Sequence, residues 1–129
     1  MLVLDASALA GWLMPDEDGA DLISLAGHHD VFAAPMLLWA EIRNILVVAE
    51  RRGRITRERV DQAIETIGDL GIVLDTAPSS AGVLGLCRKH RLTAHDALYL
   101  DLALRESGDL ATLDTALARA ARAEGVIVA

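Results

Sequence analysis

Residues 2–7 read Leu-Val-Leu-Asp-Ala-Ser, and this stretch indicates the class of fold. Consecutive apolar residues without polar alternation are typical of a strand that is buried on both faces, as in a parallel sheet. The first strand is therefore expected from Leu2 to Asp5, and a helical pattern follows from Ser7 to Leu13. A short buried strand that leads at once into a helix predicts an α/β protein.

Short apolar runs alternate with longer helical patterns along the rest of the chain. Further strands are expected at residues 31–34, 72–75, 110–112 and 126–128. Further helices are expected at residues 18–26, 36–52, 78–90, 94–107 and 115–124, and between Thr56 as an N-cap and Gly68 or Gly71. This order predicts a three-layer α/β/α sandwich with a short, mainly parallel central sheet. No linker or repeat interrupts it, so residues 1–129 are expected to form a single domain.

The composition indicates an ordered core and a cytoplasmic location. Hydrophobic residues make up 53% of the 129 residues, which is too many for a disordered chain. No apolar run approaches the roughly 20 residues that span a bilayer, so no membrane segment is expected. The first residues lack a basic region and a cleavage site, so a secretory peptide is not expected either. A lone Cys87 offers no disulfide framework and agrees with a reducing compartment.

The net charge of −7 argues at first sight against a nucleic-acid partner. A bound cation would, however, offset part of that charge, and an acidic body can still carry a local basic patch. Eleven of the twelve basic residues are arginine, which binds phosphate through two parallel hydrogen bonds. The arginines that follow the long helix are the candidate RNA contacts: Arg51, Arg52 and Arg54, with Arg57 and Arg59 beyond them.

Glu41 lies within the apolar stripe of the long helix. At about 100° per residue, Leu37, Ile45 and Val48 all fall within about 40° of Glu41. The pattern therefore predicts that Glu41 occupies the middle of the buried face. A buried carboxylate is costly unless it is paired. The alternatives are a functional carboxylate and a core glutamate that pairs with a buried arginine.

Three aspartates occupy positions that each have a second explanation. Asp5 and Asp114 precede helices and have the N-cap position, and Asp96 ends a Thr-Ala-His-Asp sequence with the spacing of a capping box. Yet Asp5 and Asp114 also follow strands, and ligands of parallel sheets bind beyond the carboxyl ends of the strands. If the fold brings these aspartates and Glu41 together, a hard divalent cation is the natural counter-charge.

The remaining polar residues predict no other site. Asp101 is expected to pair with Arg105 one helical turn away, and Asp75 is expected to be a turn residue. The histidines lack the spacing of a zinc site. The first helices carry more apolar residues than one face can bury, which predicts either an association surface or a second core face: Trp12, Leu13, Leu38, Trp39, Leu46 and Val47.

Four segments of the chain resemble a known family. They are LVLDASALAGWLMPDE at residues 2–17, APMLLWAEIRNIL at 34–46, LTAHDALYLDLAL at 92–104 and ATLDTAL at 111–117. In this order they resemble PIN domains, and more closely the VapC-type ribonuclease toxins of bacterial VapBC toxin–antitoxin pairs. The resemblance covers nearly the whole chain.

The resemblance implies that Asp5, Glu41, Asp96 and Asp114 are the catalytic and metal-binding carboxylates. Ser7, Asn44 and Thr112 match polar positions around that site, and His95 stands where many relatives have tyrosine. The implied activity is a Mg²⁺- or Mn²⁺-dependent endoribonuclease that acts on tRNA or rRNA. The implied partners are a VapB-type antitoxin and a second copy of the chain. The alternative is a catalytically silent PIN-like domain that binds RNA or protein.

Overall fold

A computed structural model describes residues 1–14, 24–25 and 27–129. Four strands form one sheet in the order β3-β2-β1-β4: β1 (Leu2–Leu4), β2 (Phe32–Pro35), β3 (Val73–Asp75) and β4 (Asp109–Ala111). Every neighbouring pair is parallel. The predicted parallel sheet is confirmed, and each predicted strand up to residue 112 is present within about one residue. Most of the helix that was expected at residues 18–26 lies outside the described residues.

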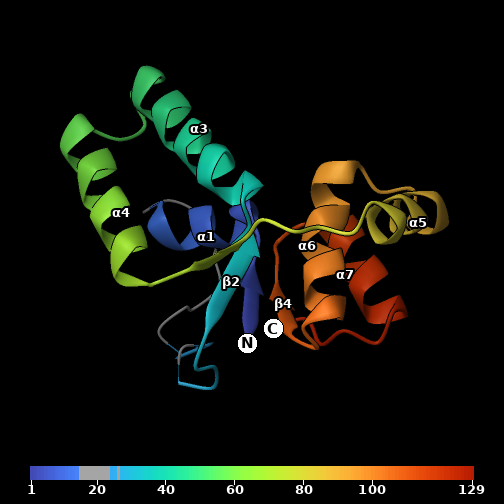
Figure 1. The fold of residues 1–129 in the computed structure, drawn as a ribbon. Helices are drawn as coiled ribbons and strands as arrows, with labels where there is room; N and C mark the ends of the chain where they lie inside the picture. The colour runs from blue at the N-terminus through green and yellow to red at the C-terminus, as the bar shows by residue number, and fades with distance from the viewer. Residues whose placement is uncertain (15–23, 26) are drawn as a thin grey trace.

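Helices cover the sheet on both sides. Their bounds are α1 (Ala6–Leu13), α3 (Leu37–Arg51), α4 (Arg57–Asp69), α5 (Ser80–His90), α6 (Ala94–Arg105) and α7 (Thr115–Ala123). Figure 1 shows α1, α3 and α4 on one side of the sheet and α5, α6 and α7 on the other. The predicted three-layer architecture is therefore confirmed. No helix of the described residues is long and apolar enough to cross a membrane.

The central strand β1 forms the middle of the core. Leu2, Val3 and Leu4 are each 0% exposed, because α6 packs on β1 from one side and α1 and α3 lie on the other. This double coverage explains why all three residues are apolar and why the sequence shows no alternation there.

The strand order places a topological switch between β1 and β4. The chain moves from β1 to β2 and β3 in one direction, and β4 then pairs with the opposite edge of β1. In open parallel sheets such a switch leaves a crevice beyond the carboxyl ends of the two strands. Asp5 follows β1 directly, and Thr112 follows β4 directly, so both lie at this crevice.

The final strand that was expected at residues 126–128 is not present, and this prediction was wrong. Only an isolated parallel bridge joins Val128 to Leu110. Leu110 donates to the Ile127 carbonyl at 2.9 Å and accepts from the Ala129 amide at 2.8 Å. Its neighbours in β4 instead direct their backbone groups to β1. A three-residue strand therefore offers only one residue to a further neighbour, because alternate residues face opposite edges.

The buried face of α3 also differs from the prediction. The buried side chains are Leu38, Ile42, Leu46 and Ala49, whose common direction lies about a quarter turn from Glu41. Glu41 is half-buried at the border of this face. Leu38 and Leu46 therefore belong to the core and are not surplus apolar residues, whereas Trp39 remains 52% exposed. Helix α3 has apolar residues on two overlapping faces. The face that contains Leu38, Ile42, Leu46 and Ala49 is the one that packs on α1 and β2.

The predicted boundaries of α3 and α4 are confirmed by their hydrogen bonds. Gly53 has φ +72°, a left-handed conformation that ends α3 without strain. The Arg54 amide donates to the Ala49 carbonyl at 2.9 Å, which completes this C-terminal motif. Thr56 caps α4 by accepting from the Arg59 amide at 3.2 Å.

Candidate functional site

Asp5 is held by three donors at the end of β1. Its Oδ1 accepts from the Ser7 hydroxyl at 2.7 Å and from the Ala8 amide at 2.9 Å, and its Oδ2 accepts from the Thr112 hydroxyl. The hydrogen bond from the Ala8 amide makes Asp5 the N-cap of α1, so the capping role that the sequence allows is confirmed. The side chain is only 5% exposed. The carboxylate is therefore fixed in one orientation.

Burial raises the pKa of Asp5 above its ordinary value, although the three donors lower it. The negative charge of Asp114 raises this pKa further. The carboxylate is thus destabilised in its ionised form by its surroundings, and a nearby positive charge would relieve that cost.

Thr112 connects Asp5 to Asp114. The Thr112 hydroxyl donates to Asp5 and accepts from the Asp114 amide at 3.0 Å. Asp114 in turn caps α7, since its Oδ1 accepts from the Leu117 amide at 2.8 Å. The Leu113 amide donates to the Ser7 hydroxyl at 2.9 Å. These bonds join the turn after β1 to the turn after β4 across the switch between the two strands.

Asp96 lies in the first turn of α6, where Thr93 caps the helix by accepting from the Asp96 amide at 3.2 Å. Burial raises the pKa of Asp96, and the charges of Asp114 and Glu41 add to that rise. The hydrogen bond with Thr93 and the charge of the exposed His95 lower it, without cancelling the rise. Asp96 is therefore the carboxylate whose pKa is raised by the charges of both Asp114 and Glu41, which come from different parts of the fold.

Glu41 reaches the same region from α3. The Tyr99 hydroxyl donates to Glu41 Oε1 at 2.6 Å. Burial raises the pKa of Tyr99, and so do the hydrogen bond to Glu41 and the charges of Glu41, Asp5 and Asp96. Tyr99 was not predicted as a site residue. Its spacing of three residues from Asp96, on the same helix face, is the feature of the sequence that points to it.

We call Asp5, Glu41, Asp96 and Asp114 the carboxylate cluster. Among the described residues, no arginine, lysine or histidine forms an ion pair with any member. Within the same part of the chain, no three acidic, histidine or cysteine side chains are close enough to enclose a metal ion. The donor set nevertheless fits a hard cation, because Mg²⁺ commonly uses one or two carboxylates and keeps several waters. The mutual repulsion in the cluster is the electrostatic condition that such a cation relieves.

The predicted roles of four other candidate residues stay predictions. Asn44 is exposed, and in the described part of the chain no hydrogen bond joins it to Glu41. The three exposed arginines at the end of α3 begin ten residues after Glu41, which corresponds to about 15 Å along the helix. Figure 1 shows α3 leading away from the sheet toward its connection with α4. Arg51, Arg52 and Arg54 are therefore remote from the carboxylates, and their RNA-binding role stays a prediction.

Asp101 is buried, which the sequence did not indicate. The residue is 4% exposed, and its Oδ2 accepts from Arg105 Nε at 2.8 Å and from the Ser79 amide at 3.4 Å. Arg105 also donates to Asp75 Oδ2 at 2.6 Å. The predicted pair of Asp101 and Arg105 is confirmed, but the pair belongs to a network that joins the end of β3 to α5 and α6.

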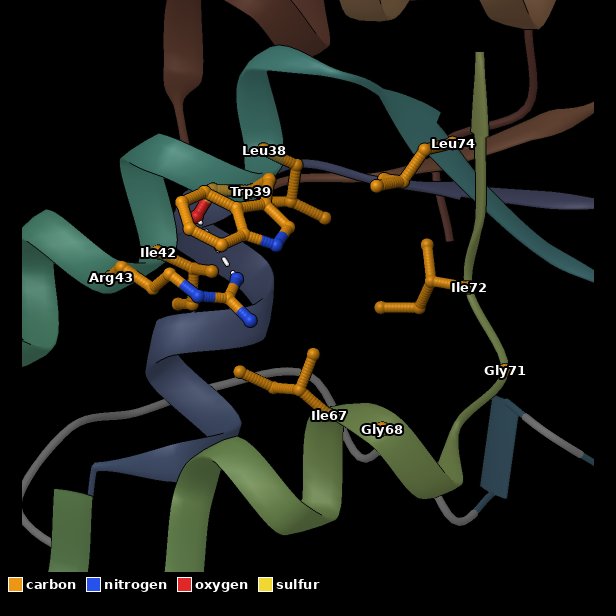
Figure 2. A pocket seen from close by; sticks show the side chains of 9 residues that line it. All are labelled: Leu38, Trp39, Ile42, Arg43, Ile67, Gly68, Gly71, Ile72 and Leu74. Atoms are coloured by element: carbon orange, nitrogen blue, oxygen red, sulfur yellow. Dashed lines mark hydrogen bonds between the residues drawn. The ribbon is translucent and has the colours of Figure 1, made fainter. Parts of the chain in front are cut away.

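A cavity of about 180 Å³ between α3, α4 and β3 contains none of the carboxylates. Figure 2 shows its largely apolar lining, which includes Ile42, Ile67 and Ile72. At its rim the Arg43 guanidinium stacks on the Trp39 ring, 3.9 Å from the ring centroid. This cavity has no acid, base or nucleophile, so the chemistry of the protein is better sought at the carboxylate cluster.

Comparisons with known proteins identify the family and the fold. Residues 2–123 match the family described as PIN domain. The chain is 31% identical over 121 residues to "Ribonuclease VapC3" of Pyrobaculum aerophilum, an alignment that covers 91% of this chain and 92% of that protein. Two crystal structures share the fold. PAE2754 from Pyrobaculum aerophilum has a TM-score of 0.71 and 22% identity over 98% of this chain and 87% of its own. FitAcB from Neisseria gonorrhoeae has a TM-score of 0.66 and 17% identity over 99% of this chain and 96% of its own.

Proposed function

Because this chain belongs to the PIN-domain family, in its VapC type, we propose that it is a metal-dependent endoribonuclease. In this proposal it is the toxin of a type II toxin–antitoxin pair and acts in the cytoplasm on tRNA or rRNA. Residues 1–129 would form a single nuclease domain. The similarity to a protein named ribonuclease VapC3 supports the reaction class.

The observation that carries this proposal is the set of hydrogen bonds that gathers the carboxylates: Thr112 joins Asp5 to Asp114, and Tyr99 on α6, the helix of Asp96, donates to Glu41. The charges of these groups also act on one another. Asp114 raises the pKa of Asp5 and of Asp96, and Glu41 raises that of Asp96. A scaffold has no reason to keep ionisable groups at a mutual cost, whereas a site that receives Mg²⁺ or Mn²⁺ does.

Each carboxylate has a distinct part in the proposed reaction. Asp5 and Asp96 would be the principal ligands of Mg²⁺ or Mn²⁺, while Ser7 and Thr112 hold Asp5 in orientation. Glu41 and Asp114 would complete the site or orient the attacking water. When bound, the metal supplies positive charge for the phosphate and lowers the pKa of water. The oxygen of water would join phosphorus while the bond to the 3′ oxygen breaks. The water would give up a proton and the 3′ oxygen would take one up from solvent, so that the products carry a 5′-phosphate and a 3′-hydroxyl.

The direct test is RNA cleavage by the purified protein. Cleavage should stop with a chelator and return with Mg²⁺ or Mn²⁺, and Asp5→Asn should abolish it. Asp61→Asn on the exposed face of α4 is the matched control, since it removes the same charge at a distance from the cluster. Equal cleavage by wild type and Asp5→Asn would rule the proposal out.

The second candidate is a catalytically silent PIN-like domain that binds RNA or protein. It is favoured by one observation, namely that no three described carboxylates enclose a metal site. Thermal unfolding at increasing Mn²⁺ separates the two candidates. A ligand that binds only the native state raises the melting temperature with its concentration. No shift at millimolar Mn²⁺ would favour the silent domain.

We further propose a VapB-type antitoxin as the restraining partner. The carboxylate cluster has no cationic partner in the described part of the chain. An arginine from a basic, partly apolar tail can satisfy carboxylates through paired hydrogen bonds and obstruct the metal. Inhibition by such a tail should weaken as Mn²⁺ rises. Inhibition that is unchanged over a hundredfold range of Mn²⁺ would exclude direct occupation of the site.

A homodimer is the expected assembly without the antitoxin. Met36 directly precedes α3 and Trp39 lies in its first turn. They are 48% and 52% exposed, and exposed apolar residues of this kind support an association surface. Light scattering should give about twice the 13.8 kDa mass of one chain. A monomer at micromolar concentration would contradict the proposal.

A further inference from the structure

Two residues from opposite helical layers meet at the mouth of the carboxylate cluster. Glu41 is on α3 and Tyr99 is on α6, and these helices lie on different sides of the sheet (Figure 1). The Tyr99 hydroxyl donates to Glu41 Oε1 at 2.6 Å, between residues 58 positions apart in the chain. We propose that Tyr99 is a positioning residue, which fixes Glu41 toward the other carboxylates. This inference rests on the proposed metal-dependent function.

Tyr99 is suited to hold another side chain because it is itself immobile. It is 2% exposed and lies on the inner face of α6, with Leu100 and Ala103 fully buried beside it. A tyrosine ring has only two side-chain torsions, and both are restricted when the ring is packed. Its hydroxyl therefore presents a hydrogen to α3 at a fixed point.

Glu41 needs such a partner more than Asp5 does. Glu41 is half-buried at the border of the buried face of α3, and ordering a long glutamate side chain costs rotamer entropy. In the described part of the chain, Tyr99 is the only group that donates to Glu41, whereas Asp5 has three donors. The orientation of Glu41 thus depends on one hydroxyl.

The hydrogen bond from Tyr99 also gives the two carboxylate oxygens of Glu41 different surroundings. Oε1 is engaged by Tyr99, while no described residue donates to Oε2. Tyr99 therefore leaves Oε2 available toward the cation and its waters. Residues that orient metal ligands in this way typically change metal affinity by about 10- to 100-fold when they are altered.

The test measures Mn²⁺ binding directly, by the electron paramagnetic resonance signal of free Mn²⁺, in four full-length proteins. These are wild type, Tyr99→Phe, Glu41→Ala and the double variant. Tyr99→Phe keeps the ring and removes only the hydroxyl, so it should weaken binding by about 10-fold. In the Glu41→Ala background the same change should have no further effect, because Tyr99 acts through Glu41.

Two further variants keep the test decisive. If Tyr99→Phe does not fold, Glu41→Asp is the second variant. It retains the charge but shortens the side chain, so it should lose the Tyr99 contact and bind Mn²⁺ about 10-fold more weakly than wild type. Thr66→Val removes a remote hydroxyl on α4, which donates to the Gln62 carbonyl at 3.0 Å, and should bind like wild type.

The outcomes separate the inference from the proposed function. Wild type that binds Mn²⁺ and cleaves RNA, with Tyr99→Phe binding equally well, would overturn the role of Tyr99 alone. The role of Tyr99 would also be overturned if Tyr99→Phe lowered Mn²⁺ affinity equally in the wild-type and Glu41→Ala backgrounds, because Tyr99 would then not act through Glu41. Wild type that neither binds Mn²⁺ nor cleaves RNA would overturn the proposed function and this inference together.

Discussion

The hydroxyl of Thr112 donates to the carboxylate of Asp5, although the two residues are 107 positions apart in the chain. The bond joins the ends of β1 and β4 at the switch of the sheet. Both partners are buried, at 9% and 5% exposure, so water does not easily replace the bond if it is lost.

Thr112→Val should therefore destabilise the protein and impair the site. A hydrogen bond to a charged group contributes about 1.5–3 kcal/mol, so the free energy of unfolding should fall by about that amount. RNA cleavage should fall as well, because Asp5 loses one of the groups that orient it. Urea unfolding and cleavage rates measure the two effects. Thr115→Val, at an exposed position of α7, is the control and should leave both nearly unchanged.

Asp96→Asn should raise the melting temperature in the presence of a chelator. Two effects oppose each other at Asp96: the dipole of α6 favours a negative charge in the first turn, while burial, Asp114 and Glu41 oppose it. The raised pKa of Asp96 indicates that the opposing effects are the larger ones.

The pH dependence of this gain in melting temperature follows from the direction of the pKa shift of Asp96. A raised native pKa means that the native state binds the proton more tightly than the unfolded state, so wild type loses stability as pH rises through that range. The advantage of Asp96→Asn should be largest near neutral pH and should shrink as pH falls toward the ordinary aspartate value of 3.8. Melting curves from about pH 7.5 to about pH 4 test this, with Asp61→Asn as the control. A variant less stable than wild type at neutral pH would contradict the argument.

Gly82 and Gly85 on α5 should respond in opposite ways to alanine. A Cβ at Gly82 would overlap Asp101 Oδ1, and the hydrogen bonds of Asp101 to Arg105 and Ser79 oppose its movement away. Gly82→Ala should cost about 1–3 kcal/mol through overpacking.

At Gly85 a Cβ would meet no atom within 4 Å. Gly85→Ala should therefore stabilise the helix by about 0.5–1 kcal/mol, because alanine loses less backbone entropy than glycine. Urea unfolding of both variants provides the comparison. A loss of stability for Gly85→Ala that matched the loss for Gly82→Ala would show that contact with Asp101 is not the cause.

The network of Asp75 and Arg105 should contribute to acid sensitivity. The hydrogen bond from Arg105 lowers the pKa of Asp75 below its ordinary value of 3.8. A lowered native pKa gives stability that is present above the unfolded pKa and is lost as pH falls through the native one. Asp75→Asn should therefore be less stable than wild type at pH 7, and the difference should shrink as pH falls below the ordinary aspartate value of 3.8. Unfolding free energies across this range measure it, and a constant difference would contradict it.

Local features of the sequence were sufficient for most elements of the fold. The sequence offers Asp5, Thr56 and Asp114 as N-caps, and the structure confirms all three, because an N-cap depends on a side chain and amides within three residues. The unbroken apolar run of β1 indicated coverage on both faces. The position of Asp5 and Asp114 at one edge followed as well, since parallel strands end at the same edge of a sheet.

Packing decided what the periodicity of α3 left open. Leu37 and Ile45 define one apolar face with Glu41, while Leu38, Ile42 and Leu46 define another. Both faces satisfy a helical period, and only the contact with α1 and β2 distinguishes them. The burial of Asp101 is a similar case, because its amide donor at Ser79 comes from a helix that precedes α6.

The sequence by itself determined that this protein is an α/β domain with aspartates at the carboxyl edge of its sheet. Those features depend on the order of elements and on hydrogen bonds between near neighbours. The tertiary structure decided that Thr112 orients Asp5 and that Tyr99 orients Glu41. Each of these bonds joins residues that are distant in the chain, and its geometry exists only once the sheet and both helical layers have packed.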